Sequence, residues 1–235
     1  GWAKYDDWKH DDAVPEMLAA DIKVPVFHAV RPDNGKPAVL EGGSIDVNGR
    51  GIMLTTEECL LGEVQQRNPG LDRPGVESLF ADYLGIRKTI WLRNGIVGDD
   101  THGHVDDLAR FTAPDTIVIV SEKNRDDANY ELLRENLALL KAARDLSGKP
   151  FRVVTLPMPE PVVYDGQRLP ASYANFYIAN SCVLVPAFND PHDREALNTL
   201  QRLFPKRRVI GIACTDLVWG LGTLHCMTQQ QPVAP

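Results

Sequence analysis

The sequence predicts an α/β protein built from repeated ββαβ units. Two short runs of alternating apolar and polar residues are followed by a helix-like spacing of apolar residues and by another apolar run, and this order occurs three times. A chain of 235 residues can bury a sizeable core, and a content of 43% hydrophobic and 24% charged residues is typical of a globular protein. We therefore expect a folded repeat architecture.

The first unit begins with a predicted β-hairpin. Its strands are Ser44 to Val47 and Ile52 to Thr56, joined by Asn48-Gly49, a dipeptide that favours tight hairpin turns. A strand at Lys88 to Leu92 ends the unit. Five apolar residues between them share one face of a predicted helix: Val76, Leu79, Phe80, Tyr83 and Leu84. Before residue 37, we expect irregular structure with a short helix at Asp11 to Ala20.

Two further units follow the same order. The second contains strands His104 to Phe111 and Thr116 to Val120, a helix over Asn129 to Asp145 and strand Arg152 to Leu156. The third contains strands Tyr173 to Ile178 and Val183 to Pro186, a helix near Asp193 to Phe204 and strand Val209 to Ile212. A last predicted strand, Thr223 to Met227, opens a fourth unit. The first strands of a radial repeat converge on its axis, so residues on them can meet in one central pocket.

Charge and cysteine content exclude several classes of function. A net charge of -7 disfavours a nucleic-acid partner, and no stretch approaches the roughly 18 apolar residues of a membrane span, so we expect neither partner. The four cysteines lie far apart, without zinc-site spacing or disulfide density, which favours a cytoplasmic compartment. The chain begins at Gly1 without methionine or a signal-peptide pattern, so we expect the natural N-terminus to be absent.

Four polar residues occupy the same position in successive units. Each lies at or just before a predicted first strand: Glu41, His104, Asn175 and Cys226. A cysteine, a histidine and carboxylates in one pocket are the groups that nucleophilic catalysis requires. The sequence therefore predicts that these residues, distant along the chain, form one site.

Two segments support this prediction. In GDDTHGHVDDLARF, His104 and Asp106 are two residues apart, so on a strand they face the same pocket. Gly103 allows the backbone to approach a ligand closely, and Asp99-Asp100 adds negative potential. Glu41 precedes two glycines, which allows a carboxylate to enter a crowded site.

Several of these residues have a plainer interpretation. Most single cysteines are inert apolar residues, which we expect for Cys59, Cys182 and Cys214. The same interpretation remains open for Cys226. Asp99 could belong to a solvated loop, and Asp107 could mark a helix N-terminus.

Three histidines raise the alternative of a metal site. His102 and His104 form an HxH pair, and His225 could supply a third nitrogen. The region lacks a further set of ligands at fixed spacing, so we expect no metal.

Four segments stand in a fixed order along the chain: LEGGSIDVNGRGIMLTTEECLL, GDDTHGHVDDLARF, LPASYANFYIANSCVLVPAFNDP and WGLGTLHCMTQQQP. Together they resemble successive motifs of the agmatine deiminase family, also described as bacterial-type peptidylarginine deiminases. The resemblance runs from residue 1 to residue 235. It implies the pentein fold, a five-bladed α/β propeller of ββαβ units. It also implies a single N-terminally truncated domain over residues 1–235, with about three full units and part of another.

The resemblance gives each candidate residue a role. It implies that Cys226 is the nucleophile, His104 the general acid and base, Asp106 a carboxylate that grips the guanidinium, and Glu41 a neighbour that orients His104. On the substrate side we expect two further residues: Asp100 and Gly222. A guanidinium is planar and always protonated, so carboxylates suit its charge and its donors.

The activity implied is hydrolysis of agmatine to N-carbamoylputrescine and ammonia through an S-alkylthiouronium on cysteine. No metal or organic cofactor is required, and we expect a homo-oligomer. Deimination of free or peptidyl arginine and a non-catalytic pentein binding domain remain alternatives. The family also carries a WxRDxGP motif whose aspartate binds substrate, and this sequence lacks it. We expect the loss of that contact to cost about 10- to 150-fold in affinity or rate.

Overall fold

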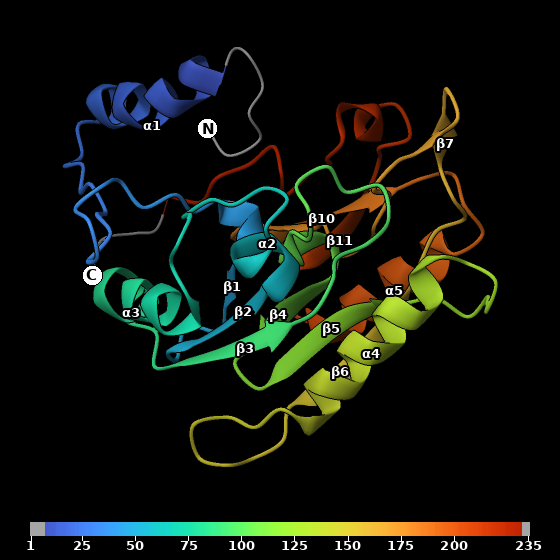
Figure 1. The fold of residues 1–235 in the computed structure, drawn as a ribbon. Helices are drawn as coiled ribbons and strands as arrows, with labels where there is room; N and C mark the ends of the chain where they lie inside the picture. The colour runs from blue at the N-terminus through green and yellow to red at the C-terminus, as the bar shows by residue number, and fades with distance from the viewer. Residues whose placement is uncertain (1–7, 232–235) are drawn as a thin grey trace.

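The computed structural model describes residues 8–231, in which three three-stranded sheets follow one another along the chain (Figure 1). The first sheet contains β1 (Asp46–Val47), β2 (Ile52–Thr56) and β3 (Lys88–Leu92), with α2 (Glu57–Leu61) and α3 (Arg73–Leu84) between its last two strands. β1 and β2 are antiparallel, and β3 is parallel to β2. This is a ββαβ unit.

The other two sheets repeat this arrangement. The second contains β4 (Ala109–Ala113), β5 (Thr116–Ser121), α4 (Asn129–Ala142) and β6 (Arg152–Pro157). The third contains β9 (Tyr177–Ile178), β10 (Cys182–Ala187), α5 (Asp193–Leu203) and β11 (Arg208–Ala213). In both, the first pair of strands is antiparallel and the second pair is parallel. The predicted threefold repeat is therefore confirmed.

The remaining elements lie outside the three units. They are α1 (Trp8–Ile22), the 3-10 turns η1 (Gly42–Ser44), η2 (Val105–Asp107) and η3 (Leu217–Gly220), and the hairpin of β7 (Val163–Tyr164) with β8 (Gln167–Arg168). None of the helices in the described part of the chain is long and apolar enough to cross a membrane.

Local sequence explains where α3 begins and ends. The side chain of Asp72 accepts a hydrogen bond from the Gly75 backbone N–H, and Pro74 is the second residue of the helix, a position in the first turn where proline is common. The helix ends at Gly85, whose φ of 64° lies in the left-handed region that glycine adopts without strain. Its buried face is Val76, Leu79 and Phe80, whereas the other two residues of the predicted face are exposed.

The first strands of the three units are tied together near the centre. The Arg110 side chain on β4 pairs with Asp46 on β1 and donates a hydrogen bond to the carbonyl oxygen of Phe176, just before β9, over 2.9 Å. The Phe111 backbone N–H also donates to Asp46 over 2.7 Å. This network brings the starts of all three units, and hence the predicted site residues, to one region.

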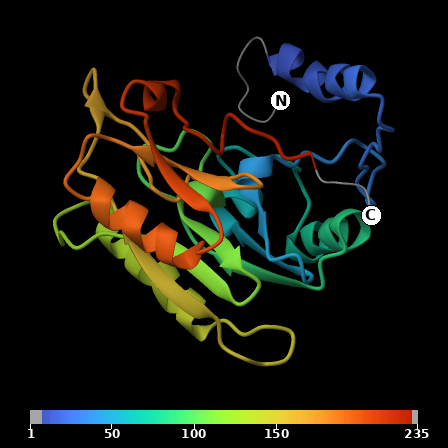
Figure 2. The ribbon, with the colours of Figure 1, turned by 180° about the vertical axis from the view of Figure 1, so that it is seen from behind.

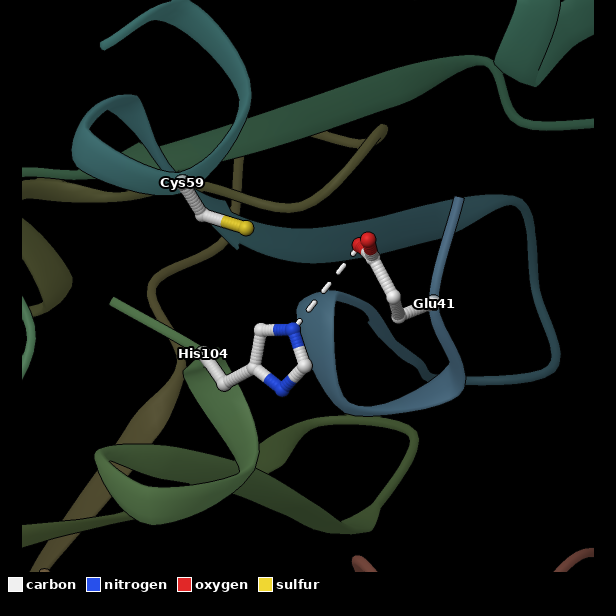
Figure 3. A group of neighbouring side chains, drawn as sticks. All are labelled: Glu41, Cys59 and His104. Atoms are coloured by element: carbon white, nitrogen blue, oxygen red, sulfur yellow. Dashed lines mark ion pairs between the residues drawn. The ribbon is translucent and has the colours of Figure 1, made fainter. Parts of the chain in front are cut away.

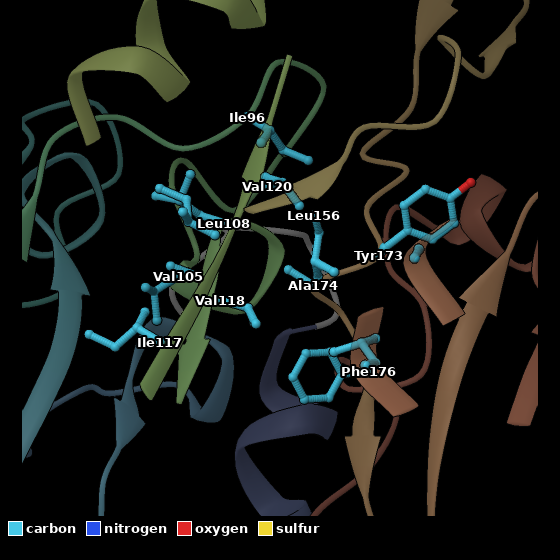
Figure 4. Close-up of a cluster of buried hydrophobic side chains, with 14 of the residues drawn as sticks. Ile96, Val105, Leu108, Ile117, Val118, Val120, Leu156, Tyr173, Ala174 and Phe176 are labelled. Atoms are coloured by element: carbon cyan, nitrogen blue, oxygen red, sulfur yellow. The ribbon is translucent and has the colours of Figure 1, made fainter. Parts of the chain in front are cut away.

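Most of the core lies between the sheets and the helices outside them. Figure 4 shows part of it, where strand residues such as Val118 and Val120 pack beside Leu156 and Phe176. A smaller cluster of buried apolar residues lies beneath α3. Figures 1 and 2 show α3, α4 and α5 on the periphery of the molecule. This packing leaves the centre to polar residues.

Three strand predictions near the centre were wrong. The segment predicted as a strand from Thr223 to Met227 forms a turn, in which the Met227 N–H donates to the Thr223 carbonyl over 3.2 Å. His104 precedes the turn η2, and its strand begins only at Ala109. In the third unit, β9 is shorter than predicted. In these segments, local turns and side-chain contacts of the site use backbone groups that a strand would pair.

Candidate active site

A cavity of about 750 Å³ opens at the centre of the molecule. Its wall includes five of the predicted site residues: Glu41, Asp100, His104, Gly222 and Cys226. The sixth, Asp106, is fully buried, and its Oδ2 lies 3.5 Å from the Cys226 thiol. The structure therefore brings all six residues into one region.

The position of Cys226 is set by the amide of Asn175. Oδ1 of Asn175 accepts hydrogen bonds from the Thr223 hydroxyl over 2.8 Å, from the His225 N–H over 2.9 Å and from the Cys226 N–H over 3.3 Å. These donors identify Oδ1 as the acceptor atom of the amide. They also explain why the segment turns here, because the N–H groups that a strand would pair are already used.

The other end of this amide faces the thiol. Nδ2 of Asn175 donates to Cys226 Sγ over 3.0 Å and to Asp107 Oδ1 over 3.0 Å. Asn175 is fully buried, so its orientation is fixed by these partners. Its position at the start of the third unit predicted that Asn175 belongs to the site. That position did not predict its contacts with Cys226.

The two carboxylate oxygens of Asp106 lie in different environments. Oδ2 accepts a hydrogen bond from His225 Nδ1 over 2.7 Å and contacts the Cys226 thiol. Oδ1 is buried and has no hydrogen-bond partner among residues 8–231. Burial opposes ionisation of Asp106, but the His225 hydrogen bond and the charges of His104 and Arg110 lower its pKa. A buried carboxylate with an unused acceptor can bind a cationic N–H donor.

The thiol and its second acidic neighbour have raised pKa values. Burial and the negative charges of Asp106 and Asp107 raise the pKa of Cys226, although the residue itself is exposed at the cavity. Burial, reinforced by the charges of Asp106 and Asp99, raises the pKa of Asp107 well above its usual value. A thiol beside two carboxyl groups stays neutral until a positive charge arrives.

His104 is a nearly buried part of the cavity wall. Its Nε2 faces Glu41, with 3.8 Å between Nε2 and Oε2, and Figure 3 shows Cys59 on the same side of the ring. Burial opposes the charged imidazole, but contacts with Cys59 and Glu41 and the charge of Asp106 raise the pKa of His104 well above its usual value. The site therefore favours an imidazolium.

Glu41 is held by an arginine that the sequence analysis did not single out. The buried Arg67 donates from Nε to Oε1 of Glu41 over 3.2 Å, and from Nη2 to the Thr101 carbonyl over 2.6 Å. Burial raises the pKa of Glu41, but the contacts with His104 and Arg67 outweigh it and lower that pKa. Arg67 lies outside the motifs found in the sequence. Its role is shown only by its contact with Glu41 in the folded chain.

The loop that carries His104 is closed by Asp99. One oxygen of Asp99 accepts the backbone N–H groups of Gly103 and His104, each over 2.9 Å, and the other accepts that of Thr101 over 2.8 Å. Gly103 has a φ of 92°, and an added Cβ would lie 2.9 Å from the Glu58 carboxylate. Asp99 therefore shapes the loop through these hydrogen bonds. Asp107 is buried and ends the turn η2, so it does not mark a helix N-terminus.

Side chains that could coordinate a metal form two groups among the described residues. One is Glu41, Cys59 and His104, and the other is Asp106, Asp107 and Cys226. Neither contains His102, whose Nδ1 instead contacts the Asp100 carbonyl over 3.0 Å. The HxH pair considered from the sequence is thus not assembled as a pair of neighbouring ligands.

Repeated ββαβ units around a cavity that is lined by a cysteine, a histidine and carboxylates are the fold and site of the pentein class. The match to a family model is more specific. Residues 1–232 match the model of the Porphyromonas-type peptidyl-arginine deiminases, and the chain belongs to this family.

Individual relatives agree with this assignment. A "Putative agmatine deiminase" of Legionella pneumophila is 39% identical over 229 residues, which cover 97% of this chain and 63% of the relative. The solved agmatine deiminase of Enterococcus faecalis is 34% identical, with a TM-score of 0.87 over 96% of this chain and 64% of its own. A solved "Putative Arginine Deiminase" of Porphyromonas gingivalis is 45% identical, with a TM-score of 0.79 over 83% of this chain and 57% of its own. The chain spans less than two thirds of the length of the curated relatives it matches.

Proposed function

We propose that the protein deiminates agmatine to N-carbamoylputrescine and ammonia, and that residues 1–235 belong to one domain carrying most of the active site. Residues 1–7 and 232–235 of that range lie outside the described residues. Relatives named as agmatine deiminases support the proposal, and one solved relative from C. jejuni, 33% identical, is described as having substrate bound. The observation that carries it is the Asp106 carboxylate: its Oδ2 contacts the Cys226 thiol, and its Oδ1 is buried without a hydrogen-bond partner among residues 8–231.

Substrate recognition follows from charge and shape. The guanidinium would donate to Oδ1 of Asp106. Because the other oxygen of this carboxylate, Oδ2, lies 3.5 Å from Sγ of Cys226, the central carbon of the substrate would come near the thiol. Asp100 and Gly222, which line the same cavity, would contact the remaining substrate. An added Cβ on Gly222 would lie 3.1 Å from Sγ, so the absence of a side chain there keeps the approach to the thiol open.

The substrate would itself activate the nucleophile. The negative charges of Asp106 and Asp107 contribute to the raised pKa of Cys226. A guanidinium bound between them and the thiol compensates these charges and lowers the thiol pKa. The thiolate then forms mainly when the site is occupied, and the amide N–H of Asn175 stabilises it.

The reaction then divides into two additions. Sγ of Cys226 adds to the guanidinium carbon, His104 as imidazolium gives its proton to the departing nitrogen, and ammonia leaves when the C–N bond breaks. His104 next takes a proton from water, which adds to the thiouronium carbon. The C–S bond then breaks and the added hydroxyl loses its proton to solvent, which returns the thiolate and releases N-carbamoylputrescine. Glu41 keeps the imidazole oriented through both steps.

Arginine is the second candidate substrate. The family description names peptidyl-arginine deiminases, and the P. gingivalis relative is named as an arginine deiminase. Both substrates present the same guanidinium to Asp106 and Cys226, so the choice depends on contacts at the far end of the substrate. Assembly as a homo-oligomer remains a prediction.

A substrate panel tests the proposal. Ammonia release is measured with agmatine, free arginine and a peptide ending in arginine, first for the 235-residue chain and then for this chain joined to the part of the Legionella relative that the match does not cover. We expect agmatine to be preferred, and expect Cys226→Ser to abolish release while Cys182→Ser does not. A preference for arginine would show that arginine, not agmatine, is the substrate. If neither protein releases ammonia, the proposal is overturned.

A further inference from the structure

Cys59 is a buried thiol that the proposed reaction does not use. It lies in the short helix α2 and is fully buried, yet it faces the general acid rather than the apolar core alone. We infer that Cys59 is a positioning residue that holds the His104 imidazole against Glu41 and keeps water away from this pair. The inference rests on the proposed function for the role of His104, but the placement of Cys59 can be tested without turnover.

Two side chains, those of Glu41 and Cys59, lie on the Nε2 side of the His104 imidazole. A ligand atom from each of Glu41, Cys59 and His104 lies within 4.8 Å of the other two, and Figure 3 shows the sulfur and the carboxylate on the same side of the ring. The other ring nitrogen, Nδ1, points toward Gly43, where an added Cβ would lie 2.5 Å from it and 3.0 Å from Asp106 Oδ2. Nε2 thus faces the side of Glu41 and Cys59, and Nδ1 faces the side of Asp106.

The same arginine fixes both neighbours of the ring. Arg67 donates from Nε to Glu41 and from Nη1 to the Cys59 carbonyl over 3.2 Å. The Cys59 N–H is itself bonded to the hydroxyl of Thr56 over 3.1 Å, at the start of α2. Backbone groups on both sides of Cys59 are therefore held, which fixes the direction of its side chain.

A neutral thiol suits this position. Burial raises the pKa of Cys59 despite its contact with His104, so the sulfur adds no negative charge that would compete with Glu41. Sulfur is a weak acceptor that can share the Nε2 proton with the carboxylate, and it fills space that water would otherwise occupy. The shared proton favours the imidazolium, and the exclusion of water strengthens its attraction to Glu41, which offsets the cost of burial.

Other charges also face the ring and must be kept unchanged in a test. They come from the segment before η1, from the loop after α2 and from the turn η2: Glu41, Arg67, Asp106 and Asp107. Cys214 provides a matched control, since both cysteines are fully buried members of apolar clusters. The pKa of Cys214, however, is raised by burial and opposed only by a backbone hydrogen bond, with no contribution from His104.

The test is an NMR titration of the His104 imidazole in the 235-residue chain labelled with nitrogen-15, with its signals assigned by their loss in His104→Asn. We expect Cys59→Ala to lower the pKa of His104 relative to the wild type, and Cys59→Ser to restore most of it because a hydroxyl remains a polar partner. Cys214→Ala should titrate like the wild type. Since Cys59→Ala is at risk of unfolding, Cys59→Val serves as a second variant that fills the space but removes the acceptor.

The outcomes separate the inference from the proposed function. Equal titration of His104 in the wild type and in both Cys59→Ala and Cys59→Val would overturn the inference, as would an equal shift in Cys214→Ala. In an active protein, we also expect the alkaline limb of kcat/KM to move to lower pH, with a loss of about 3- to 10-fold near neutral pH. If the titration shifts while agmatine is never hydrolysed, the proposed function fails and the placement of Cys59 stands.

Discussion

Asp106 contacts Cys226 through one carboxylate oxygen, 3.5 Å from the thiol, and keeps its other oxygen buried without a hydrogen-bond partner among residues 8–231. Leaving a buried acceptor unused costs free energy in the empty site. A bound guanidinium would satisfy that acceptor and compensate the charge that keeps the thiol protonated. Recognition and activation would therefore depend on the same carboxylate.

Asp106→Asn should separate these two effects. Removing the negative charge lowers the pKa of Cys226, so iodoacetamide, which is uncharged, should alkylate this thiol faster at neutral pH. Agmatine turnover should nevertheless fall by about 10- to 150-fold, because a charge-assisted hydrogen bond to the substrate is lost. Alkylation is followed by peptide mass spectrometry and turnover by ammonia release. Slower alkylation would contradict the assigned cause of the raised thiol pKa.

Gly222→Ala should displace the nucleophile. The new Cβ would lie 2.8 Å from Cys226 Cβ and 3.1 Å from Sγ, so one of the two segments must move. We expect a loss of about 100-fold in kcat, since displacements of this size disturb the alignment of reacting atoms. Gly220→Ala is the matched control, because nothing lies within 4 Å of its added Cβ. Equal activity of the two variants would rule out this crowding.

Asn175→Asp should slow the reaction of Cys226 with iodoacetamide. The substitution removes the N–H donor 3.0 Å from Sγ and adds a negative charge beside a thiol that already has two acidic neighbours. We expect a decrease of at least about tenfold at neutral pH, because each unit of thiol pKa changes the thiolate fraction tenfold. The exposed Asn180→Asp adds the same charge on the surface and should react like the wild type. Unchanged alkylation of Asn175→Asp would show that this amide does not support the thiolate.

Asp107→Asn should stabilise the fold at neutral pH. The folded-state pKa of Asp107 is raised, so its contribution to stability is fully present below its ordinary pKa of about 4 and is lost as pH rises through the raised value. An amide avoids this loss and can still accept the hydrogen bond from Asn175. We expect a gain of about 1 kcal/mol at pH 7, or a few degrees in Tm. Thermal unfolding at pH 4 and pH 7 checks the sign, and a gain that is larger at pH 4 would contradict it.

The repeat was predictable because hairpins and amphipathic helices leave local patterns. The Asn48-Gly49 turn and the apolar face of α3 both appear in the structure. The sequence predicted which residues form the site, but it did not predict the backbone conformation that brings them together. His104 and Asp106 were expected to converge by strand alternation, whereas they converge from a 3-10 turn that Asp99 supports.

Residues that act through tertiary contacts left little signal. Arg67 and Cys59 lie eight residues apart and outside the segment that carries His104, so only folding shows that they meet behind its imidazole. The turn at Thr223 to Met227 resembled a strand because its apolar residues alternate. The amide of Asn175, more than 45 residues away, instead determines its conformation.

The most direct test of the account is to capture the covalent intermediate. The active protein is mixed with agmatine, stopped in acid and analysed by peptide mass spectrometry. We expect an adduct with the mass of agmatine minus ammonia on the peptide containing Cys226, and expect both the adduct and ammonia release to be lost in Cys226→Ser. An adduct on another cysteine, or continued release of ammonia by Cys226→Ser, would contradict the role of Cys226 as the nucleophile.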